Sequence, residues 1–339
     1  MRGGRDVAAT GPGEASPLTD RLVVVGASAG GLEALQQLVA GLPADLPAAV
    51  LVAVHLQPSS DSALPKVLAR AGALPAAHPR TGEALRPGSI VVAPPDQHLL
   101  VHDSKVRLSR GPRENRQRPA IDALFRSAAA AYGPGVVAVV LSGALDDGAV
   151  GAAAVAAQDG VVLVQDPDEA RVTGMPRAAL AAVRRARALP AAALGPAVAD
   201  LVRRPVAERG GVGAQQEGRV VMEQPPTATS ELGTPAALGC PECQGGMFES
   251  APDGAVIYTC HVGHAWSAQT LLDAERQSVE GAIYNAASKL LEMAAVHRRL
   301  AQHAERGDGD PGEHLRAAEA AEERSRRIQE LATEDPGPD

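Results

Sequence analysis

The stretch VVVGASAGGLEAL, from Val23 to Leu35, joins a short apolar run, a glycine-rich turn and the start of a second apolar segment. This order predicts a buried strand, a tight turn and a helix. A turn of this kind can hold a phosphate group at the helix N-terminus, or it can present a nucleophilic serine, here Ser28. A purely structural turn is a third interpretation, because the glycine pattern alone is weak evidence.

More apolar runs of strand length follow, and helix-like segments rich in alanine and leucine separate them. This alternation predicts an α/β fold with a doubly wound, mostly parallel sheet of Rossmann-like topology. Two later segments alternate polar and apolar residues more strongly and predict an antiparallel hairpin insert. The strand-like runs are residues 21–26, 48–56, 136–143 and 160–165, the helical ones include 32–42 and 120–133, and the hairpin insert is GSIVVAP (88–94) with HLLVHDSKVRLSR (98–110).

Composition divides the chain into five expected segments. They are a disordered lead-in (1–19), an α/β domain (20–204), a linker rich in Gly, Pro, Gln, Glu and Thr (205–236), a small zinc-ribbon-like module (237–266) and a helical hairpin (267–331). The net charge of −8 comes from an acidic excess in the second part of the chain, which argues against a nucleic-acid partner. No apolar run is long enough to span a membrane, and no secretory signal is recognisable. We therefore expect a cytoplasmic protein without membrane insertion.

Polar residues stand at the ends of the predicted parallel strands. Ser28 follows the first strand, His55 ends the second, and Asp146 and Asp147 follow the third. A dinucleotide site would require an acidic residue after the second strand, where this chain has His55. Because parallel strands end at one edge of the sheet, a serine, its base and an orienting acid would meet there. Taken singly, the histidine could bond to the backbone and the aspartates could cap a helix.

All three cysteines lie in CPEC and TCHVGH, as Cys240, Cys243 and Cys260. An odd number with close spacing argues against a disulfide framework and for a metal site. We predict a structural zinc ion held by these cysteines and by His264. We prefer His264 to His261 because it stands farther from Cys260, so that both side chains can reach one ion. Three unpaired thiols are the alternative.

The sequence after Ser267 is helical in pattern. Leu272, Val279, Ala286, Met293 and Leu300 repeat every seven residues, and Ile283 and Leu290 add a second apolar position. The GDGDPG turn at 307–312 separates this helix from a second one with Leu315, Ile328 and Leu331. The pattern predicts a hairpin packed through this seam, or a helix that binds a partner or a second copy.

Six motifs occur in a fixed order over residues 20–190: GASAGG, the histidine of VAVHLQP, VAPPDQHLLV, NRQRPAIDALFRSAA, LSGALDDGAVGA and TGMPRAA. Together they resemble the catalytic domain of the chemotaxis protein-glutamate methylesterase (CheB-type) family. The resemblance implies a doubly wound parallel sheet and a Ser-His-Asp triad that hydrolyses glutamate γ-methyl esters on chemoreceptors, releasing methanol. Some members also deamidate receptor glutamines. The resemblance also implies that catalysis needs no cofactor.

Carried over motif by motif, the resemblance assigns Ser28 as nucleophile, His55 as base and Asp147 as the orienting acid. Asp147 is chosen over Asp146 because it directly precedes Gly148. The oxyanion would be bound by backbone amides at Ala29 and Ala144. Relatives often have Thr and Met at these two positions. The resemblance therefore does not decide whether a chain with alanine at both positions is fully active. The expected form is a stand-alone catalytic domain without a receiver domain.

A basic stretch precedes the helix-like segment at 120–133 and contains Lys105, Arg107, Arg110, Arg113, Arg116 and Arg118. It is either a solvated surface or a docking site for acidic receptor helices, with Arg116 and Arg118 in the family motif. A methyl-accepting chemoreceptor is the expected partner. The alternative function is a non-catalytic signalling module that keeps the fold and binds a receptor or its methyltransferase. A nucleotide-binding Rossmann domain is the other alternative.

Overall fold

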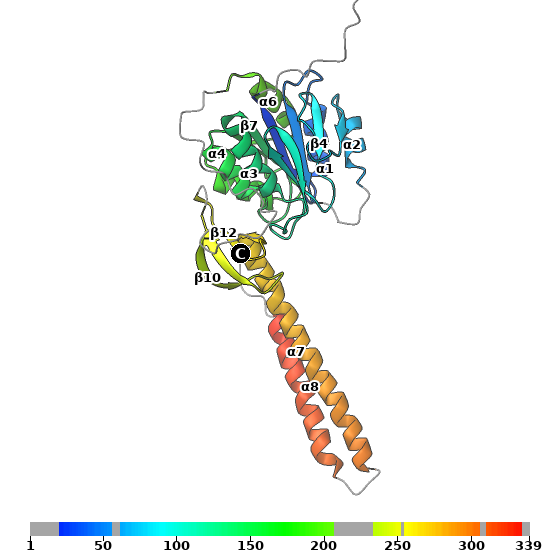
Figure 1. Cartoon of the computed structure of the whole chain (residues 1–339). Helices are drawn as coiled ribbons and strands as arrows, with labels where there is room; N and C mark the ends of the chain where they lie inside the picture. The colour runs from blue at the N-terminus through cyan, green and yellow to red at the C-terminus, as the bar shows by residue number, and fades with distance from the viewer. Residues whose placement is uncertain (1–19, 56–61, 207–232, 252–253, 306–309, 334–339) are drawn as a thin grey trace, which may run out of the picture. The chain divides into compact units, whose positions relative to one another are not determined.

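The structure is a computed structural model that describes residues 20–55, 62–206, 233–251, 254–305 and 310–333 (Figure 1). The predicted lead-in (1–19) and most of the predicted linker lie outside these described residues. Two compact units are distinguished. One contains the α/β domain and the strands of the cysteine-containing module, and the other contains residues 268–339 with the turn at 241–244. The two units are described separately below.

A seven-stranded sheet forms the centre of the α/β domain, with strand order β3-β4-β2-β1-β7-β8-β9. Every neighbouring pair in it is parallel. The predicted parallel sheet is thus confirmed. The strands are β1 (Leu22–Ala27), β2 (Ala49–Val54), β3 (Ala76–Ala77), β4 (Ser89–Val92), β7 (Val136–Val140), β8 (Val161–Gln165) and β9 (Arg187–Leu189).

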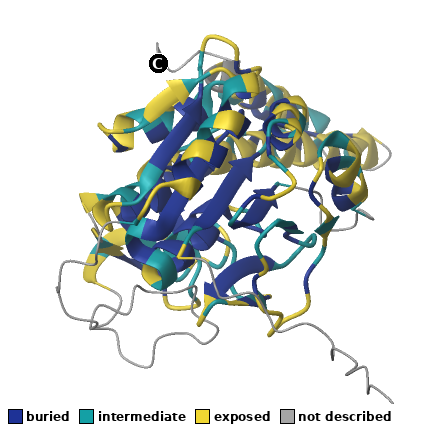
Figure 2. Ribbon diagram, turned by 90° about the horizontal axis from the view of Figure 1, so that it is seen from above, coloured by how far each residue is buried: buried dark blue, intermediate teal, exposed yellow. Residues whose placement is uncertain are grey.

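Helices cover both faces of this sheet, so that its central strands are buried (Figure 2). Side chains along a strand alternate between the two faces. In β1, Val23 and Val25 pack with one group of helices, whereas Leu22 and Val24 pack with the other. The first group is α1 (Leu32–Ala40), α2 (Leu64–Ala71) and α6 (Ala191–Arg203); the second is α3 (Ile121–Tyr132), α4 (Ala149–Ala157) and α5 (Gly174–Ala182), with a short 3-10 turn, η1 (Gly133–Gly135), after α3.

The predicted hairpin insert is half right. Strands β5 (His98–His102) and β6 (Lys105–Ser109) form an antiparallel hairpin as expected. The other segment, GSIVVAP, is wrongly assigned, because its strand β4 pairs in parallel with β2 inside the main sheet. Only two residues of β4 are fully buried, since β4 lies near the sheet edge where cover is thinner. Its alternating pattern therefore reflects partial exposure rather than antiparallel pairing.

The cysteine-containing module is a small antiparallel sheet of order β10-β11-β12-β13. Its core is small and includes Met247, Phe248 and Trp266. A module with so few buried side chains requires another source of stability, as is usual for small metal-binding domains. The strands are β10 (Thr234–Gly239), β11 (Gly246–Ser250), β12 (Ile257–Cys260) and β13 (Ala265–Ser267).

The second unit contains a pair of long helices, α7 (Ala268–Glu305) and α8 (Pro311–Thr333), which confirms the predicted hairpin. The prediction that the hairpin packs through the seven-residue seam is wrong, whereas binding of a partner or a second copy through that seam stays a prediction. Leu272, Val279 and Met293 are about half exposed, and Ala286 and Leu300 are exposed as well. The buried stripe runs one residue later along α7, through Ala287, Ala294 and Ala301. Ala294 packs against Ala318 and Ala321 of α8. Small side chains allow two helix backbones to approach closely, whereas the larger residues remain outside.

None of the helices in the described ranges combines the length and hydrophobicity needed to cross a membrane.

Candidate active site

Ser28 directly follows β1, and the chain turns tightly there before α1 begins. The Gly31 amide donates to the Ser28 carbonyl at 3.0 Å, and the Ser28 amide donates to the Ser142 carbonyl beyond β7 at 3.0 Å. A Cβ on Gly31 would lie 2.8 Å from that Ser142 oxygen. This close approach explains the glycine and fixes the serine turn against the end of a neighbouring strand.

His55 lies at the end of β2 and bridges a serine and an aspartate. Its Nδ1 is 3.0 Å from Ser28 Oγ, and its Nε2 is 2.7 Å from Asp147 Oδ2. The His55 and Asp147 side chains are only 11% and 4% exposed. Because a carboxylate accepts hydrogen bonds, Nε2 must carry the proton of the neutral ring. Nδ1 is then a free lone pair directed at the Ser28 hydroxyl.

Sheet order brings these residues together. Strand β1 pairs with β2 on one side and with β7 on the other. The three strands that precede Ser28, His55 and Asp147 are therefore adjacent, and their carboxyl ends share one edge. Asp146 points elsewhere, because its Oδ1 accepts a hydrogen bond from Ser267 Oγ at 2.9 Å.

Asp147 is buried and accepts four hydrogen bonds. Oδ2 accepts from His55 and from the Ile121 amide at 2.8 Å, and Oδ1 accepts from the Asp122 amide at 3.0 Å and from Asn115 Nδ2 at 3.3 Å. Burial by itself raises the pKa of Asp147, but the His55 contact and the two amides of α3 outweigh burial and keep it below its ordinary value. The carboxylate is therefore charged next to the imidazole.

A second buried carboxyl group, Asp122, lies beside Asp147 and was missed in the sequence analysis. Its Oδ1 accepts from the Gly148 and Gly151 amides at 2.9 and 2.7 Å, and its Oδ2 accepts from Asn115 Nδ2 at 3.0 Å. Burial and the Asp147 charge raise the pKa of Asp122 well above its ordinary value. Asn115 thus donates to both carboxyl groups. Asn115 and Asp122 are the first and last residues of the NRQRPAID motif, and Asp122 is the second residue of α3.

The Ala29 and Ala144 amides, which the sequence analysis assigned to the oxyanion, lie in the turns after β1 and β7. Within the described residues, neither amide donates a hydrogen bond to another group. Ser142 holds the first turn, since its Oγ contacts the Ala29 carbonyl at 2.9 Å. A Cβ on Gly143 would lie 2.9 Å from Ser28 Cβ. Both turns therefore adjoin the serine, and their roles in catalysis remain predictions.

The two arginines predicted to dock substrate have different environments. Arg118 is mostly buried and donates to Asp96 through Nε and Nη2, at 3.0 and 2.7 Å, and to the Gly111 carbonyl at 2.7 Å. These bonds fix the loop that precedes α3. The Arg118 hydrogen bond lowers the pKa of Asp96. Arg116 is exposed. A docking role remains a prediction for both.

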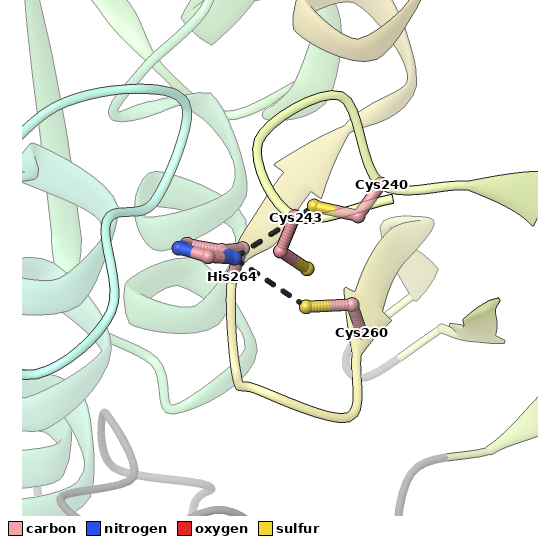
Figure 3. A group of neighbouring side chains, drawn as sticks. All are labelled: Cys240, Cys243, Cys260 and His264. Carbon is pink, nitrogen blue, oxygen red and sulfur yellow. Dashed lines mark hydrogen bonds between the residues drawn. The ribbon is translucent and has the colours of Figure 1, made fainter. Parts of the chain in front are cut away.

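The three cysteines and His264 form a compact cluster (Figure 3). Their ligand atoms all lie within 4.8 Å of one another. His264 Nδ1 is 3.7 Å from Cys240 Sγ and 3.5 Å from Cys260 Sγ. His261 instead packs its ring edge against Phe248, with centroids 4.8 Å apart. Three thiolates and one imidazole suit a tetrahedral zinc ion, so the cluster could hold a metal.

Comparisons with known proteins place the α/β domain in a family. The family model of the CheB methylesterase matches residues 23–198, just over half of the chain. A protein-glutamate methylesterase/protein-glutamine glutaminase 1 of Xanthomonas euvesicatoria pv. vesicatoria is 42% identical over 165 residues, which is 48% of this chain and 46% of that protein. A protein-glutamate methylesterase/protein-glutamine glutaminase of Nocardioides sp. is 40% identical over 193 residues, covering 56% of this chain and 52% of that protein.

A solved structure resembles the α/β domain as well. The CheB methylesterase catalytic domain of Thermotoga maritima matches with a TM-score of 0.51 and 31% identity, covering 53% of this chain and 98% of that structure. The chain spans about half the length of the curated relatives it matches. The match covers the α/β domain that carries Ser28, His55 and Asp147, and this chain belongs to the CheB methylesterase family.

Proposed function

We propose that this chain is a serine esterase that hydrolyses glutamate γ-methyl esters on chemoreceptor-type proteins and deamidates glutamine side chains on the same partners. The observation that carries the proposal is the continuous hydrogen-bond chain from Ser28 Oγ through His55 to Asp147. The relatives named protein-glutamate methylesterase/protein-glutamine glutaminase support the choice of substrate. A non-catalytic module would not need this chain of bonds.

The proposed reaction proceeds by acyl transfer. Ser28 Oγ attacks the ester carbonyl while His55 Nδ1 takes the hydroxyl proton. The tetrahedral intermediate then collapses, His55 gives that proton to the leaving oxygen, and methanol departs. Water, activated by the same imidazole, hydrolyses the acyl-serine and leaves a glutamate side chain. With a glutamine substrate the leaving group is ammonia, and the same steps produce the same glutamate.

Two local features favour the charges that develop in this reaction. The charged Asp147 accepts the Nε2 proton, holds the ring in one tautomer and stabilises the imidazolium that forms. The Ala29 and Ala144 amides are the proposed donors to the oxyanion, since they lie in the turns that adjoin Ser28 and have no other acceptor in the described residues. Alanine serves in these positions because the backbone N–H is the donating group.

The direct test is methanol release from a methylated chemoreceptor by the wild type and by Ser28→Ala. Breaking a triad lowers the rate by roughly 10⁴-fold or more, so the variant should release methanol at background rate. Ser288→Ala, an exposed serine on α7, is the matched control and should match the wild type. Equal rates for the wild type and Ser28→Ala would instead support a binding module.

We also propose that the cysteine cluster holds a structural Zn²⁺ ion. The four side chains would fill a tetrahedral shell, leaving no position for substrate, so the ion would stabilise the module without taking part in ester hydrolysis. The small core of this module gives the physical reason, because metal binding would supply the stability that burial does not.

A further inference from the structure

Strand β13 of the cysteine module pairs with a loop of the α/β domain that adjoins the proposed active site. The Asn115 amide donates to the Ala265 carbonyl at 2.8 Å, and the Ala265 amide donates to the Arg113 carbonyl at 3.3 Å. The Ser267 amide then donates to the Asn115 side-chain oxygen at 2.8 Å. A strand of the module and residues 113–115 thus form one hydrogen-bonded ladder.

Asn115 connects this ladder to the acid of the triad. Its Oδ1 accepts from Ser267, while its Nδ2 donates to Asp122 Oδ2 at 3.0 Å and to Asp147 Oδ1 at 3.3 Å. The side chain is buried, so water cannot replace a missing partner. If the side-chain amide of Asn115 were rotated by 180°, its NH₂ group would face the Ser267 N–H, which is also a donor. Its oxygen would then face the carboxyl groups of Asp122 and Asp147. The Ser267 N–H and the two carboxyl groups therefore favour the same orientation of the Asn115 side chain, and Ser267 is the contribution of the module.

An ion pair with helix α3 also anchors the loop that carries Asn115. The neighbouring Glu114 forms an ion pair with Arg126 of α3, whose Nη2 donates to both carboxylate oxygens at 2.8 and 2.6 Å. Both side chains are largely buried. The loop is therefore held by this ion pair as well as by its backbone hydrogen bonds to Ala265, and the Ser267 amide adds a bond to the Asn115 side chain.

The position of β13 depends in turn on the cysteine cluster. The Cys260 amide donates to the His264 carbonyl at 3.0 Å, and the Gly263 amide donates to the Cys260 carbonyl at 2.9 Å. These bonds close the turn between β12 and β13, and two of the proposed zinc ligands, Cys260 and His264, are its ends. A metal ion held by both would fix the turn from which β13 starts.

We propose that the cysteine module is a built-in positioning element of the esterase site, in which metal-held β13 orients Asn115 and Asn115 in turn holds Asp147 in place. Asn115 is a positioning residue, because it acts through Asp147 and does not contact Ser28 or His55. The proposal rests on the proposed function and makes esterase activity depend on metal occupancy. It also gives the zinc-ribbon-like module a role in activity.

The test uses the full-length chain and a fluorophosphonate that labels the activated serine, with the inactivation rate constant and the binding constant measured separately. Wild type stripped of metal by a chelator should label about 10- to 100-fold more slowly at unchanged binding constant, since a buried hydrogen bond to a charged group is lost. Adding Zn²⁺ should restore the rate. Rates are normalised to the folded fraction from circular dichroism.

Two variants keep the test valid if chelation unfolds the chain. Asn115→Asp keeps the acceptor for Ser267 but removes the donor to Asp147, so its rate should fall similarly and Zn²⁺ should not restore it. Ser267→Pro removes the amide that orients Asn115 and should lose more than Ser267→Ala, which keeps it. Tyr258→Phe on β12, with no contact to Asn115, is the control and should label like wild type.

Full labelling rates for the folded metal-free chain, or for folded Asn115→Asp, would overturn the proposal. The proposed function fails by a different result: no labelling of the wild type, or labelling that persists in Ser28→Ala. If labelling occurs at Ser28 and requires His55, but its rate is unchanged by Asn115→Asp and by metal removal, the chain is an esterase whose module does not affect the site.

Discussion

The α/β domain and the cysteine module build their polar clusters in opposite ways. In the α/β domain, large apolar side chains fill both faces of a parallel sheet, and that core brings Ser28, His55 and Asp147 together from separate strands. In the module, the core is small and the cluster residues lie within one short stretch, Cys240 to His264. The difference teaches that a core can position polar groups distant in sequence, whereas a small module would depend on the proposed zinc ion for stability.

The largest expected effect concerns the proposed triad of the α/β domain. Asp147→Asn should lower the rate of methyl ester hydrolysis on the order of 10⁴-fold, because the imidazole loses its fixed tautomer and its counter-charge. The core around it is unchanged, so the protein should remain folded. Steady-state methanol release and circular dichroism check this. Asp159→Asn, at an exposed ion pair with Arg185, is the control. An active Asp147→Asn enzyme would contradict the assigned acid.

In the module, replacing one of the proposed zinc ligands should remove the metal ion. Cys260→Ser and His264→Ala should each abolish tight zinc binding, measured by atomic emission after dialysis, while the wild type retains about one ion per chain. His261→Ala is the matched control, since His261 packs against Phe248 instead of facing the cluster. Zinc loss in His261→Ala with retention in His264→Ala would reverse the ligand assignment.

A third and smaller effect is expected in α7, where the buried alanine stripe can be compared with the exposed positions beside it. Ala294 is buried against Ala318 and Ala321, so Ala294→Leu should overpack the pair and cost about 1–3 kcal/mol. Met293 is half exposed, so Met293→Gln should change the free energy of unfolding by less than about 0.5 kcal/mol. Urea unfolding followed by helical circular dichroism measures both. The reverse order would restore the seam of Met293 and Leu300.

The smallest effects concern pH, where two neighbouring carboxyl groups act in opposite directions. The pKa of Asp147 is lowered in the folded protein, so its contribution to stability is present above the unfolded pKa and is lost as pH falls through the folded one. The pKa of Asp122 is raised, so its contribution is present at low pH and is lost as pH rises through the folded pKa. Their windows lie on opposite sides of about pH 4, the ordinary carboxyl value.

The free energy of unfolding of the wild type, minus that of Asp122→Asn, should therefore grow as pH falls from neutral towards about 4. The same difference taken with Asp147→Asn should shrink below about pH 4. Denaturant unfolding at several pH values gives both curves. Two flat curves would mean that neither carboxyl group titrates differently in the folded and unfolded chains.

The short-range features of the site could be predicted from sequence. The glycine turn at Ser28, the histidine at a strand end and the aspartates before α4 are visible in the order of residues. The choice of His264 over His261 came from spacing along the chain, and the cluster in the structure contains His264. Asn115 and Asp122 could not be identified in this way, because their partners lie at the start of α4, on Asp147 and on β13, and only the folded chain brings these segments together.

What the sequence by itself determined is the central strands of the parallel sheet, the helical character of segments between them and the residues that follow strand ends, since periodicity and turn residues are local properties. Only the tertiary structure decided that β4 joins the parallel sheet, that alanines rather than leucines pack between α7 and α8, and that Asn115 links β13 to Asp147. These outcomes depend on which elements become neighbours in space. A hydrogen bond between residues far apart in the chain leaves no periodic trace in either segment.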